Sequence, residues 1–268
     1  QSSPGMTIDP AGGRIDWTPA VPGDFVVTVR VANGVGSPAE QTFTIHVAED
    51  SLCPSQTSAY YHLDEATSPF ADAAGGPPAL CANCPAPALG QVNQARRFDG
   101  AASGLAVAAH DNLFNWGRWD SFSIEFWLRR PGSCQGSTAD FNEVVAGRID
   151  PASNLAWWVG VSCQHGGRAR FVIRDSDSDN RDLADVVSLT AVTDGNWHHV
   201  TVVRDWPAID IRIYVDGRFE GAAQGFFSSG LASATAPLDI GWLNLSHGFH
   251  LEGTLDELAI YNRPLTEG

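Results

Sequence analysis

The hydrophobic positions of this chain fall in short runs that alternate with polar residues and end at Gly, Pro, Asp or Asn. Alternation with a period of two is typical of half-buried β-strands, and branched or aromatic side chains favour strands further. No long segment keeps the period of a helix. The pattern predicts strands at 25–31, 41–47, 123–128, 144–149, 155–161, 168–174, 197–204, 210–215 and 253–261.

Turn residues support this assignment. Asp216-Gly217 provides the positive φ angles of a tight hairpin after the strand that ends at Val215. Gly166-Gly167 does the same after the strand that ends at Val161. Strands at this spacing, joined by such turns, predict an all-β protein built from sandwiches.

A break in composition at 48–54 divides the chain. It separates a first segment with its own strands from a much longer remainder, and it predicts two domains, residues 1–49 and 50–268. A first segment of this length would leave strand edges unpaired and bury little core. We therefore expect the natural polypeptide to continue upstream.

The charge and hydropathy of the chain argue against nucleic acid and membrane as partners. The 268 residues include 31 acidic and 16 basic side chains, none of them lysine, for a net charge of −15. Such a surface repels nucleic-acid phosphates and anionic lipid. No apolar stretch approaches the roughly 20 residues of a membrane-spanning helix. We expect neither a nucleic-acid partner nor membrane insertion.

A series of motifs runs along the second segment. They are Tyr61-His-Leu-Asp-Glu65, Ala95 to Gly100, Phe122 to Arg129, Asp194 to Arg204, Ile213 to Gly217 and Gly253 to Leu265. In this order they resemble the laminin-G-like, concanavalin A-like family. The resemblance implies a jelly-roll β-sandwich in which the first and last strands lie together.

The first segment carries a different motif, Gly5-Met-Thr-Ile-Asp-Pro-Ala-Gly-Gly-Arg-Ile-Asp-Trp-Thr-Pro19, followed by two long strands. It resembles the second half of immunoglobulin-like (cadherin-like) modules of bacterial surface proteins. The fold class is therefore expected to be all-β, a concanavalin A-like jelly roll preceded by a partial immunoglobulin-like β-sandwich. This combination implies a secreted or cell-surface bacterial protein with other domains in the same polypeptide.

The cysteines, Cys53, Cys81, Cys84, Cys134 and Cys163, fit neither a zinc quartet nor a redox motif before a helix. Structural disulfides in an oxidising compartment explain them better. Cys134 and Cys163 each follow a strand, and these strands run in the same direction, so we expect them to pair. Cys53 is then expected to bond Cys81 or Cys84, leaving one thiol.

The family resemblance implies a structural calcium ion between the opening segment and the last strand. The matching carboxylates are Asp72 and Asp256. Two carboxylates with loop carbonyls are suitable ligands for a hard cation. Asp64, Glu65 and Asp99 are further candidates for the same place. The alternative interpretation is that Asp72 and Asp256 only cap turns.

Strand alternation also predicts a binding surface. If the aliphatic sides of the strands face the core, aromatic and guanidinium groups gather on the other side. Such groups bind sugar rings and carboxylated sugars. The predicted ligand-binding residues are Trp127, Trp158, Tyr214, Arg129, Arg170, Arg174 and Arg212, with the loop residues Trp116, Trp119 and Trp206 as alternatives.

The sequence thus favours a non-catalytic module for glycan binding or adhesion, whose partner is a glycan or a cell-surface glycoprotein. The alternative is a purely structural spacer beside a catalytic or adhesive domain. A glycoside hydrolase fits less well. Glu252 and Asp256 are four residues apart on one strand face, about 13 Å, and Glu257 is expected to point the other way. Glycosidases need carboxylates about 5 to 9.5 Å apart.

Overall fold

The computed structural model describes residues 6–8, 15–17, 23–32, 37–47, 56–110, 113–132, 142–153, 155–175, 183–245 and 249–266. The chain divides into two compact units, Gln1–Pro54 and Ser55–Gly268. No helix among the described residues has the length and apolar character needed to span a membrane.

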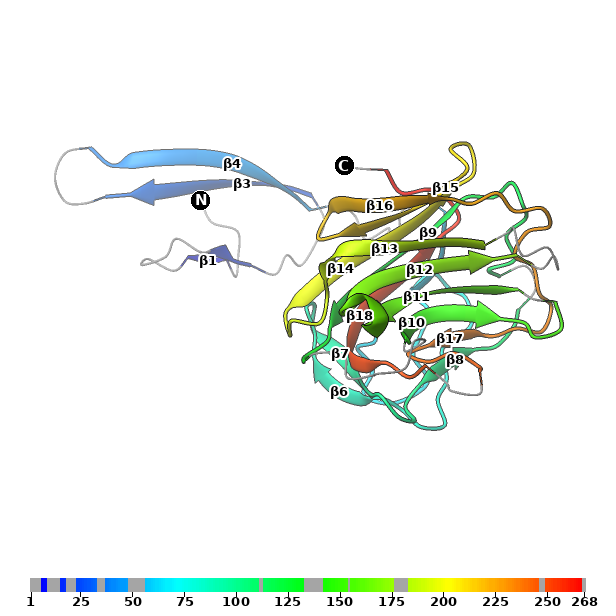
Figure 1. Cartoon of the computed structure of the whole chain (residues 1–268). Helices are drawn as coiled ribbons and strands as arrows, with labels where there is room; N and C mark the ends of the chain where they lie inside the picture. Colours follow the sequence, from blue (N-terminus) through cyan, green and yellow to red (C-terminus); the bar gives the residue numbers. More distant parts are fainter. Residues whose placement is uncertain are drawn as a thin grey trace. The chain divides into compact units, whose positions relative to one another are not determined.

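The smaller unit contains one short and one long antiparallel pair of strands (Figure 1). Strand β1 (Thr7–Ile8) pairs with β2 (Ile15–Asp16), and β3 (Gly23–Val31) pairs with β4 (Ala39–Val47). The ring of Trp17 lies 4.7 Å from that of Phe25 in an edge-to-face contact. Val27 is buried, so alternate residues of β3 supply the small apolar core of this unit.

The larger unit is a sandwich of two antiparallel sheets (Figure 1). The six-stranded sheet has the order β13-β12-β11-β10-β17-β8; its strands are β8 (Leu105–Val107), β10 (Asn142–Ile149), β11 (Ala156–Ser162), β12 (Arg168–Arg174), β13 (Leu183–Ala191) and β17 (Leu238–Ile240). The eight-stranded sheet has the order β16-β15-β14-β9-β18-β7-β6, and β5 also pairs with β18; its strands are β5 (Thr57–Tyr61), β6 (Ala86–Leu89), β7 (Gln94–Asp99), β9 (Phe122–Arg129), β14 (Trp197–Asp205), β15 (Asp210–Val215), β16 (Arg218–Gln224) and β18 (Glu252–Tyr261).

The predicted all-β jelly roll is confirmed. The strands β12 and β15 have the predicted bounds, and β5 pairs with β18, as expected for the first and last strands of the jelly roll. The hairpin turn at Asp216 and Gly217 has φ angles of 52° and 73°. The predicted bounds do not include β5, β7, β13 and β16, nor β1, β2, β6, β8 and β17, which are too short to show a period.

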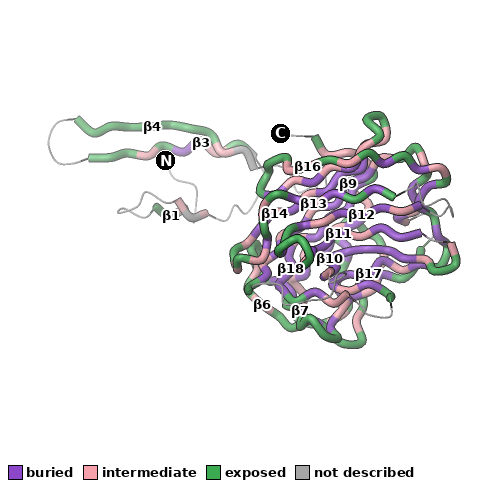
Figure 2. Tube along the Cα trace, viewed as in Figure 1, coloured by how far each residue is buried: buried purple, intermediate pink, exposed green. Residues whose placement is uncertain are grey.

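The core lies between the two sheets and takes alternate residues of most strands. Figure 2 shows buried residues along the strands of both sheets. Phe122, Ile124 and Phe126 of β9 face this core from one sheet. Trp157 and Val159 of β11 face it from the other. Each sheet therefore has an outer face as well, and because the sheets share one core, these outer faces point in opposite directions.

One predicted side-chain direction is wrong. Leu255 and Leu258 of β18 both lie in the core, although they are three positions apart. The register shifts between Asp256 and Ala259, and Glu257 adopts a positive φ of 51°. This bulge interrupts the alternation, so Asp256 and Glu257 both leave the core on the same outer side.

The structure also corrects one disulfide. Cys81 bonds Cys84, with Cα atoms 5.0 Å apart, so neither is available to Cys53. The proline-rich loop turns tightly enough to bring the two together, which spacing alone did not indicate. Cys163 is disulfide-bonded. Cys134 and Cys53 lie outside the described residues, so the pairing of Cys134 with Cys163 stays a prediction.

Candidate functional site

The predicted binding residues do not form one surface. Trp127 and Arg129 of β9, with Arg212 and Tyr214 of β15, lie on the outer side of the eight-stranded sheet. The other three belong to β11 and β12 of the six-stranded sheet: Trp158, Arg170 and Arg174. Alternation identified which side chains leave the core, but it carried no information on which sheet a strand joins.

On the six-stranded sheet, Trp158 is not an open platform. It packs against an outer apolar cluster of Val144, Ile149, Ala156 and Leu243, with Phe249 alongside. The guanidinium of Arg170 lies 5.5 Å from the Trp158 ring and pairs with Asp185 at 2.5 Å. Contacts within the chain therefore occupy Trp158, and its ring does not present an open face to a ligand.

The outer side of the eight-stranded sheet contains a groove of about 240 Å³, which we call the sheet-face groove. Strands β9, β14 and β15 form its floor, and the segment after β18 borders it. Its lining residues are Glu125, His199, Thr201, Val203, Tyr214, Gly217, Leu265 and Thr266.

The polar groups of the groove are held in place. The Tyr261 hydroxyl donates a 2.6 Å hydrogen bond to Oε1 of Glu125. Burial, followed by the neighbouring Glu125 carboxylate, raises the pKa of Tyr261 far above its usual range, so this hydroxyl remains a donor. Nε2 of His199 lies 3.5 Å from Oε2 of Glu125. The sheet thus presents a fixed carboxylate beside an imidazole.

Aromatic rings adjoin these polar groups. The ring of Trp127 lies 5.0 Å from that of His199, at an angle of 47°. The ring of Tyr214 meets Phe219 edge to face at 5.6 Å, and Phe219 is 52% exposed. The groove therefore combines apolar ring faces with hydrogen-bonding groups.

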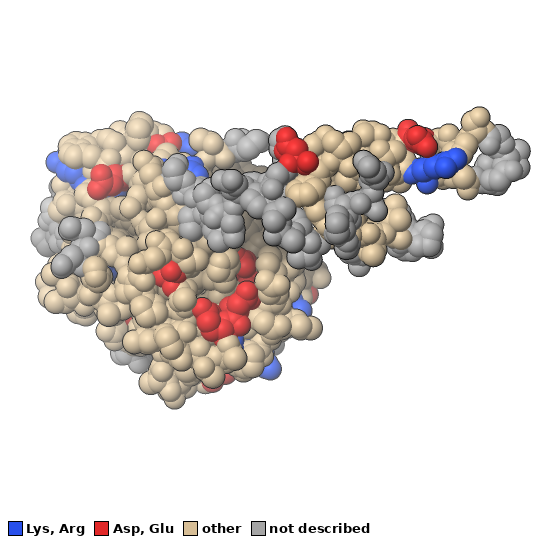
Figure 3. Space-filling model, turned by 180° about the vertical axis from the view of Figure 1, so that it is seen from behind, with Lys and Arg blue, Asp and Glu red and all other residues tan. Residues whose placement is uncertain are grey.

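The predicted arginines of this face contact neighbouring side chains. The guanidinium of Arg129 lies 5.3 Å from the Trp197 ring, and that of Arg212 pairs with Asp205 at 3.2 Å and Asp210 at 3.1 Å. Figure 3 shows acidic side chains grouped on the side of the larger unit opposite to the view of Figure 1. Because Glu125 lines the groove and Arg212 is paired, a negatively charged ligand is disfavoured in the groove.

Of the eight residues that line the groove, only Tyr214 was among the predicted binding residues. Glu125, His199 and Thr201 are polar lining residues that the prediction did not include. The alternation that identified Trp127 also places Glu125 on the outer side of β9. On β14 it places Thr201 on the same side as His199. The signal was present in the sequence, but only the strand order brings these side chains together. In the register, Trp127 is opposite His199 and Glu125 is opposite Thr201.

The proposed calcium ligands lie on different elements, Asp72 in the loop after β5 and Asp256 on β18. Oδ1 of Asp72 accepts hydrogen bonds from the backbone N–H of Tyr60 and Ala74, and Oδ2 accepts one from Gly76. Oδ2 of Asp256 instead accepts from Gln91 and Val92. The contacts of Asp72 are those of a turn cap, and they do not bring it into one ligand set with Asp256.

The surroundings of Asp256 suit a cation better. Its Oδ1 is buried and has no hydrogen-bond partner among the described residues. A Cβ placed on Gly90 would lie 2.5 Å from the Val92 carbonyl oxygen and 2.6 Å from both the Gln94 carbonyl oxygen and Oδ2 of Asp256. Burial raises the pKa of Asp256 to about 6. Oxygen atoms thus converge at this turn, as a hard cation requires.

Asp64 holds the other side of the same turn, where its Oδ1 accepts the N–H of Gln94 at 2.8 Å. Within the described ranges, no group of three or more His, Cys, Asp or Glu side chains has metal-binding geometry. Calcium here would therefore need backbone carbonyls as ligands, and its presence stays a prediction.

This chain belongs to the concanavalin A-like lectin/glucanases superfamily, whose family model matches residues 99–268. Residues 4–48 match the family described as "Putative Ig domain". These matches agree with both resemblances of the sequence. A comparison with curated proteins finds no match.

Solved structures share the fold. The binding domain of Paraclostridial Mosquitocidal Protein 1 has a TM-score of 0.61 at 15% identity, covering 79% of this chain and 50% of its own. Domain 4 of AbnA, a GH43 extracellular arabinanase from Geobacillus stearothermophilus in complex with arabinotriose, has a TM-score of 0.58 at 18% identity, covering 79% and 95%. The botulinum neurotoxin serotype G binding domain has a TM-score of 0.58 at 14% identity, covering 79% and 49%. The chain spans about half the length of the toxin binding domains that it matches.

Proposed function

We propose that the larger unit is a non-catalytic carbohydrate-binding module of a secreted or cell-surface bacterial protein, and that the sheet-face groove holds the sugar. The smaller unit then joins this module to other domains of the polypeptide. The observation that carries the proposal is that the Tyr214 ring, a fixed carboxylate, an imidazole and a hydroxyl line one groove, with the Trp127 ring beside the imidazole.

The chemistry of a sugar matches this combination. A pyranose or furanose ring has C–H faces that pack on aromatic rings and hydroxyl groups that both donate and accept hydrogen bonds. Tyr214 and Trp127 supply the rings. Glu125 accepts hydroxyl protons, whereas Thr201 and His199 are able to donate or accept. A neutral sugar suits this groove better than an anionic one, because Arg212 on the same side of the sheet is already paired with two aspartates and Glu125 lines the groove.

The comparisons support the general part of the proposal, that the larger unit is a binding module. One similar structure contains arabinotriose, and the toxin structures are binding domains. At identities of 18% or less they indicate a common architecture for recognition, and the ligand of this chain is inferred from its own groove.

A catalytic role is disfavoured by how the carboxylates of β18 are used. Glu252 pairs with Arg130 at 2.9 Å. Asp256 is fully buried, and Glu257 bonds the Tyr60 hydroxyl and Nδ1 of His62. A glycosidase needs one carboxyl group to donate a proton and another to attack or to activate water, both open to the sugar.

The experiment is a glycan array followed by calorimetric titration of the best glycan. Tyr214→Ala and Glu125→Gln are each expected to weaken binding by at least about tenfold, because each removes a contact at the centre of a small site. Leu189→Ala is the matched control, since Leu189 is exposed on the six-stranded sheet. Absence of any bound glycan would favour the spacer function, and unchanged binding by both groove variants would reject the groove.

A further inference from the structure

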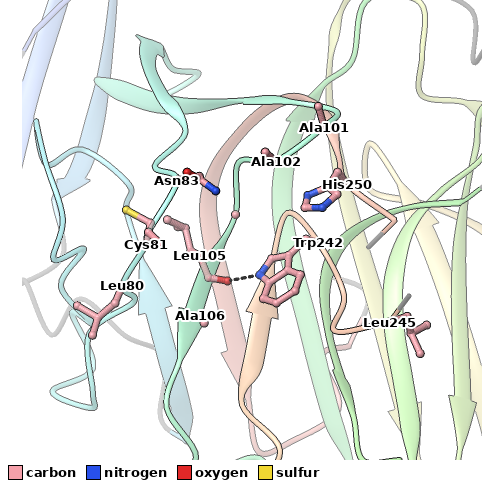
Figure 4. Close-up of a pocket in the computed structure, with 12 residues that line it drawn as sticks. Leu80, Cys81, Asn83, Ala101, Ala102, Leu105, Ala106, Trp242, Leu245 and His250 are labelled. Atoms are coloured by element: carbon pink, nitrogen blue, oxygen red, sulfur yellow. Dashed lines mark hydrogen bonds between the residues drawn. The ribbon is translucent and has the colours of Figure 1, made fainter. Parts of the chain in front are cut away.

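A second hollow lies at the edge of the six-stranded sheet, with a volume of about 660 Å³ (Figure 4). We call it the edge pocket. It lies outside the surface predicted from the sequence, and its walls come from three segments. Its lining residues are Leu80, Cys81, Ala82, Asn83, Ala101, Ala102, Gly104, Leu105, Ala106, Trp242, Leu245 and His250.

The indole of Trp242 is fixed in this pocket. Its Nε1 donates a 2.9 Å hydrogen bond to the carbonyl oxygen of Leu105, drawn in Figure 4. Its Cδ1 would lie only 2.4 Å from a Cβ on Gly104, so the glycine lets the ring pack directly on the backbone. Trp242 is half-buried and lies nearly parallel to the ring of His250, at 12° and 6.1 Å. The ring is therefore preorganised and still accessible.

Two polar groups complete the pocket. Nδ1 of His250 lies 3.3 Å from the Ser103 carbonyl oxygen, which only accepts, so Nδ1 carries the proton and Nε2 is an acceptor. Asn83 is exposed, and its side-chain amide both donates and accepts. Within the described part of the chain, neither Nε2 of His250 nor the Asn83 amide has a hydrogen-bond partner.

The Cys81–Cys84 disulfide holds the wall that carries Asn83. The carbonyl oxygen of Asn83 accepts the Gly104 N–H at 3.1 Å, and Leu80 exchanges two backbone hydrogen bonds with Ala106 of β8. These contacts tie the disulfide loop to both the sheet edge and the backbone under Trp242. A ligand would meet a formed wall, without the cost of ordering a loop.

The remaining lining is made of small and aliphatic side chains. Leu80 and Leu245 are 51% and 38% exposed and lie on opposite sides of the pocket in Figure 4, and alanines line it as well. A pocket with one aromatic platform, one primary amide and an apolar wall matches a sugar that bears an amide and a methyl group. We propose that the edge pocket binds an N-acetylated hexosamine unit of a saccharide.

In this arrangement the sugar ring packs on Trp242, the acetamido group bonds the Asn83 amide, and its methyl group contacts the aliphatic wall. Nε2 of His250 accepts a hydroxyl proton. The inference shares a ligand class with the proposed function of the sheet-face groove, but it rests on different residues on the other sheet, so either site can fail without the other.

The test is titration of the full chain with chitotriose, a trimer of N-acetylglucosamine, and with cellotriose as its counterpart without acetamido groups. Chitotriose is expected to bind at least about tenfold more tightly, because only it has an acetamido group that bonds the Asn83 amide and a methyl group that is buried against the aliphatic side chains. Asn83→Ala and Trp242→Phe are each expected to weaken chitotriose binding by at least about fivefold. Asn83 is exposed, so its variant keeps the result interpretable if the Trp242 variant misfolds.

Leu189→Ala, at an exposed position of β13 that lines neither site, is the matched control and should leave chitotriose affinity within about twofold. Saturation-transfer NMR with chitotriose should place the acetamido methyl protons closest to the protein. The edge-pocket assignment is overturned if chitotriose does not bind at about 10 mM, if cellotriose binds equally well, or if the Asn83 variant binds as the wild type does.

Discussion

Asp239 is a carboxyl group shielded completely from solvent, on β17 beside the edge pocket. Its Oδ2 accepts the Asn244 N–H at 2.9 Å, and its Oδ1 has no partner among the described residues. Burial raises its pKa to about 7. Ionisation is therefore easier in the unfolded chain, where the pKa is about 4.

The stability linked to Asp239 should be fully present below about pH 4 and be lost as pH rises through about 7, by at most about 1.4 kcal/mol per pH unit. Asp239→Asn keeps an acceptor for the Asn244 N–H and removes the ionisation. We expect this variant to have a flatter profile of unfolding free energy between about pH 4 and 7, and a higher Tm than the wild type at pH 8. Parallel urea-unfolding profiles for both proteins would contradict the assignment.

At the residue scale, the sequence predicted side chains that leave the core but not their surroundings. It selected Trp127 and Tyr214, which adjoin the groove, and also Trp158, which the loop after β17 covers with Leu243 and Phe249. It did not select Trp242, because this residue follows a strand of only three residues and has no periodic pattern around it. Burial by a distant loop is not encoded locally.

At the element scale, His198 stabilises the hairpin of β14 and β15 by ion pairs with two aspartates. Its Nδ1 lies 2.9 Å from Asp216 in the turn, and its Nε2 lies 3.1 Å from Asp194 before β14. Burial lowers the pKa of His198, but hydrogen bonds to the two carboxylates outweigh it, and the net pKa is raised. The charged imidazole is therefore favoured in the folded hairpin.

For a histidine whose folded pKa is raised, the added stability is complete below the unfolded pKa of about 6.5 and is lost as pH rises through the folded value. We expect the amides of this hairpin to exchange with solvent more slowly relative to the rest of the sheet at pH 5.5 than at pH 8.5. Asp194→Asn should reduce this difference, because it removes one of the two charges. An equal pH response in the Asp194 variant would show that the ion pair does not fasten the hairpin.

The elements themselves were largely predictable, for a local reason. A strand such as β12 alternates along its whole length, so its bounds follow from the sequence alone. The bulge at Glu257 depends instead on the pairing of β18 with β9, since one strand carries an extra residue relative to its partner. The partition of strands between two sheets is also non-local, and it separated residues that the pattern had placed together.

At the scale of the whole molecule, calcium would join the turn at 90–94 to the last strand of the sandwich. We expect added calcium at about 100 times its Kd to raise the unfolding free energy by about 2.7 kcal/mol, and a chelator to reverse this. Asp256→Asn should remove the response. Asp72→Asn should lower the Tm but keep the response, because Asp72 caps its own turn.

These variants separate the alternatives in thermal unfolding. If both lose the calcium response, Asp72 is a ligand as the family resemblance implied, and the turn-cap interpretation is wrong. If the wild type shows no response at millimolar calcium, the buried Oδ1 of Asp256 has another function, and its variant should then be more stable than the wild type because the uncompensated carboxyl group is gone.

The two proposed sites lie on opposite outer sides of the sandwich. The sheet-face groove lies on the outer side of the eight-stranded sheet, whereas Ala106 of the edge pocket alternates with the core residues Leu105 and Val107 and so leaves the six-stranded sheet outward. The larger unit then has two sites that two separate glycan chains are able to occupy simultaneously. Chitin beads carrying the protein should therefore retain a fluorescent form of the glycan selected on the array.

Loss of either site should abolish this retention, because each bridge needs both. Asn83→Ala is expected to release the protein from the beads, whereas Tyr214→Ala should leave the protein on chitin but release the fluorescent glycan. Competition provides the second measurement: soluble chitotriose should detach the protein, and excess unlabelled array glycan should displace only the label. If chitotriose displaces the label while the protein stays on the beads, the two ligands compete for one site, and the module has a single binding face.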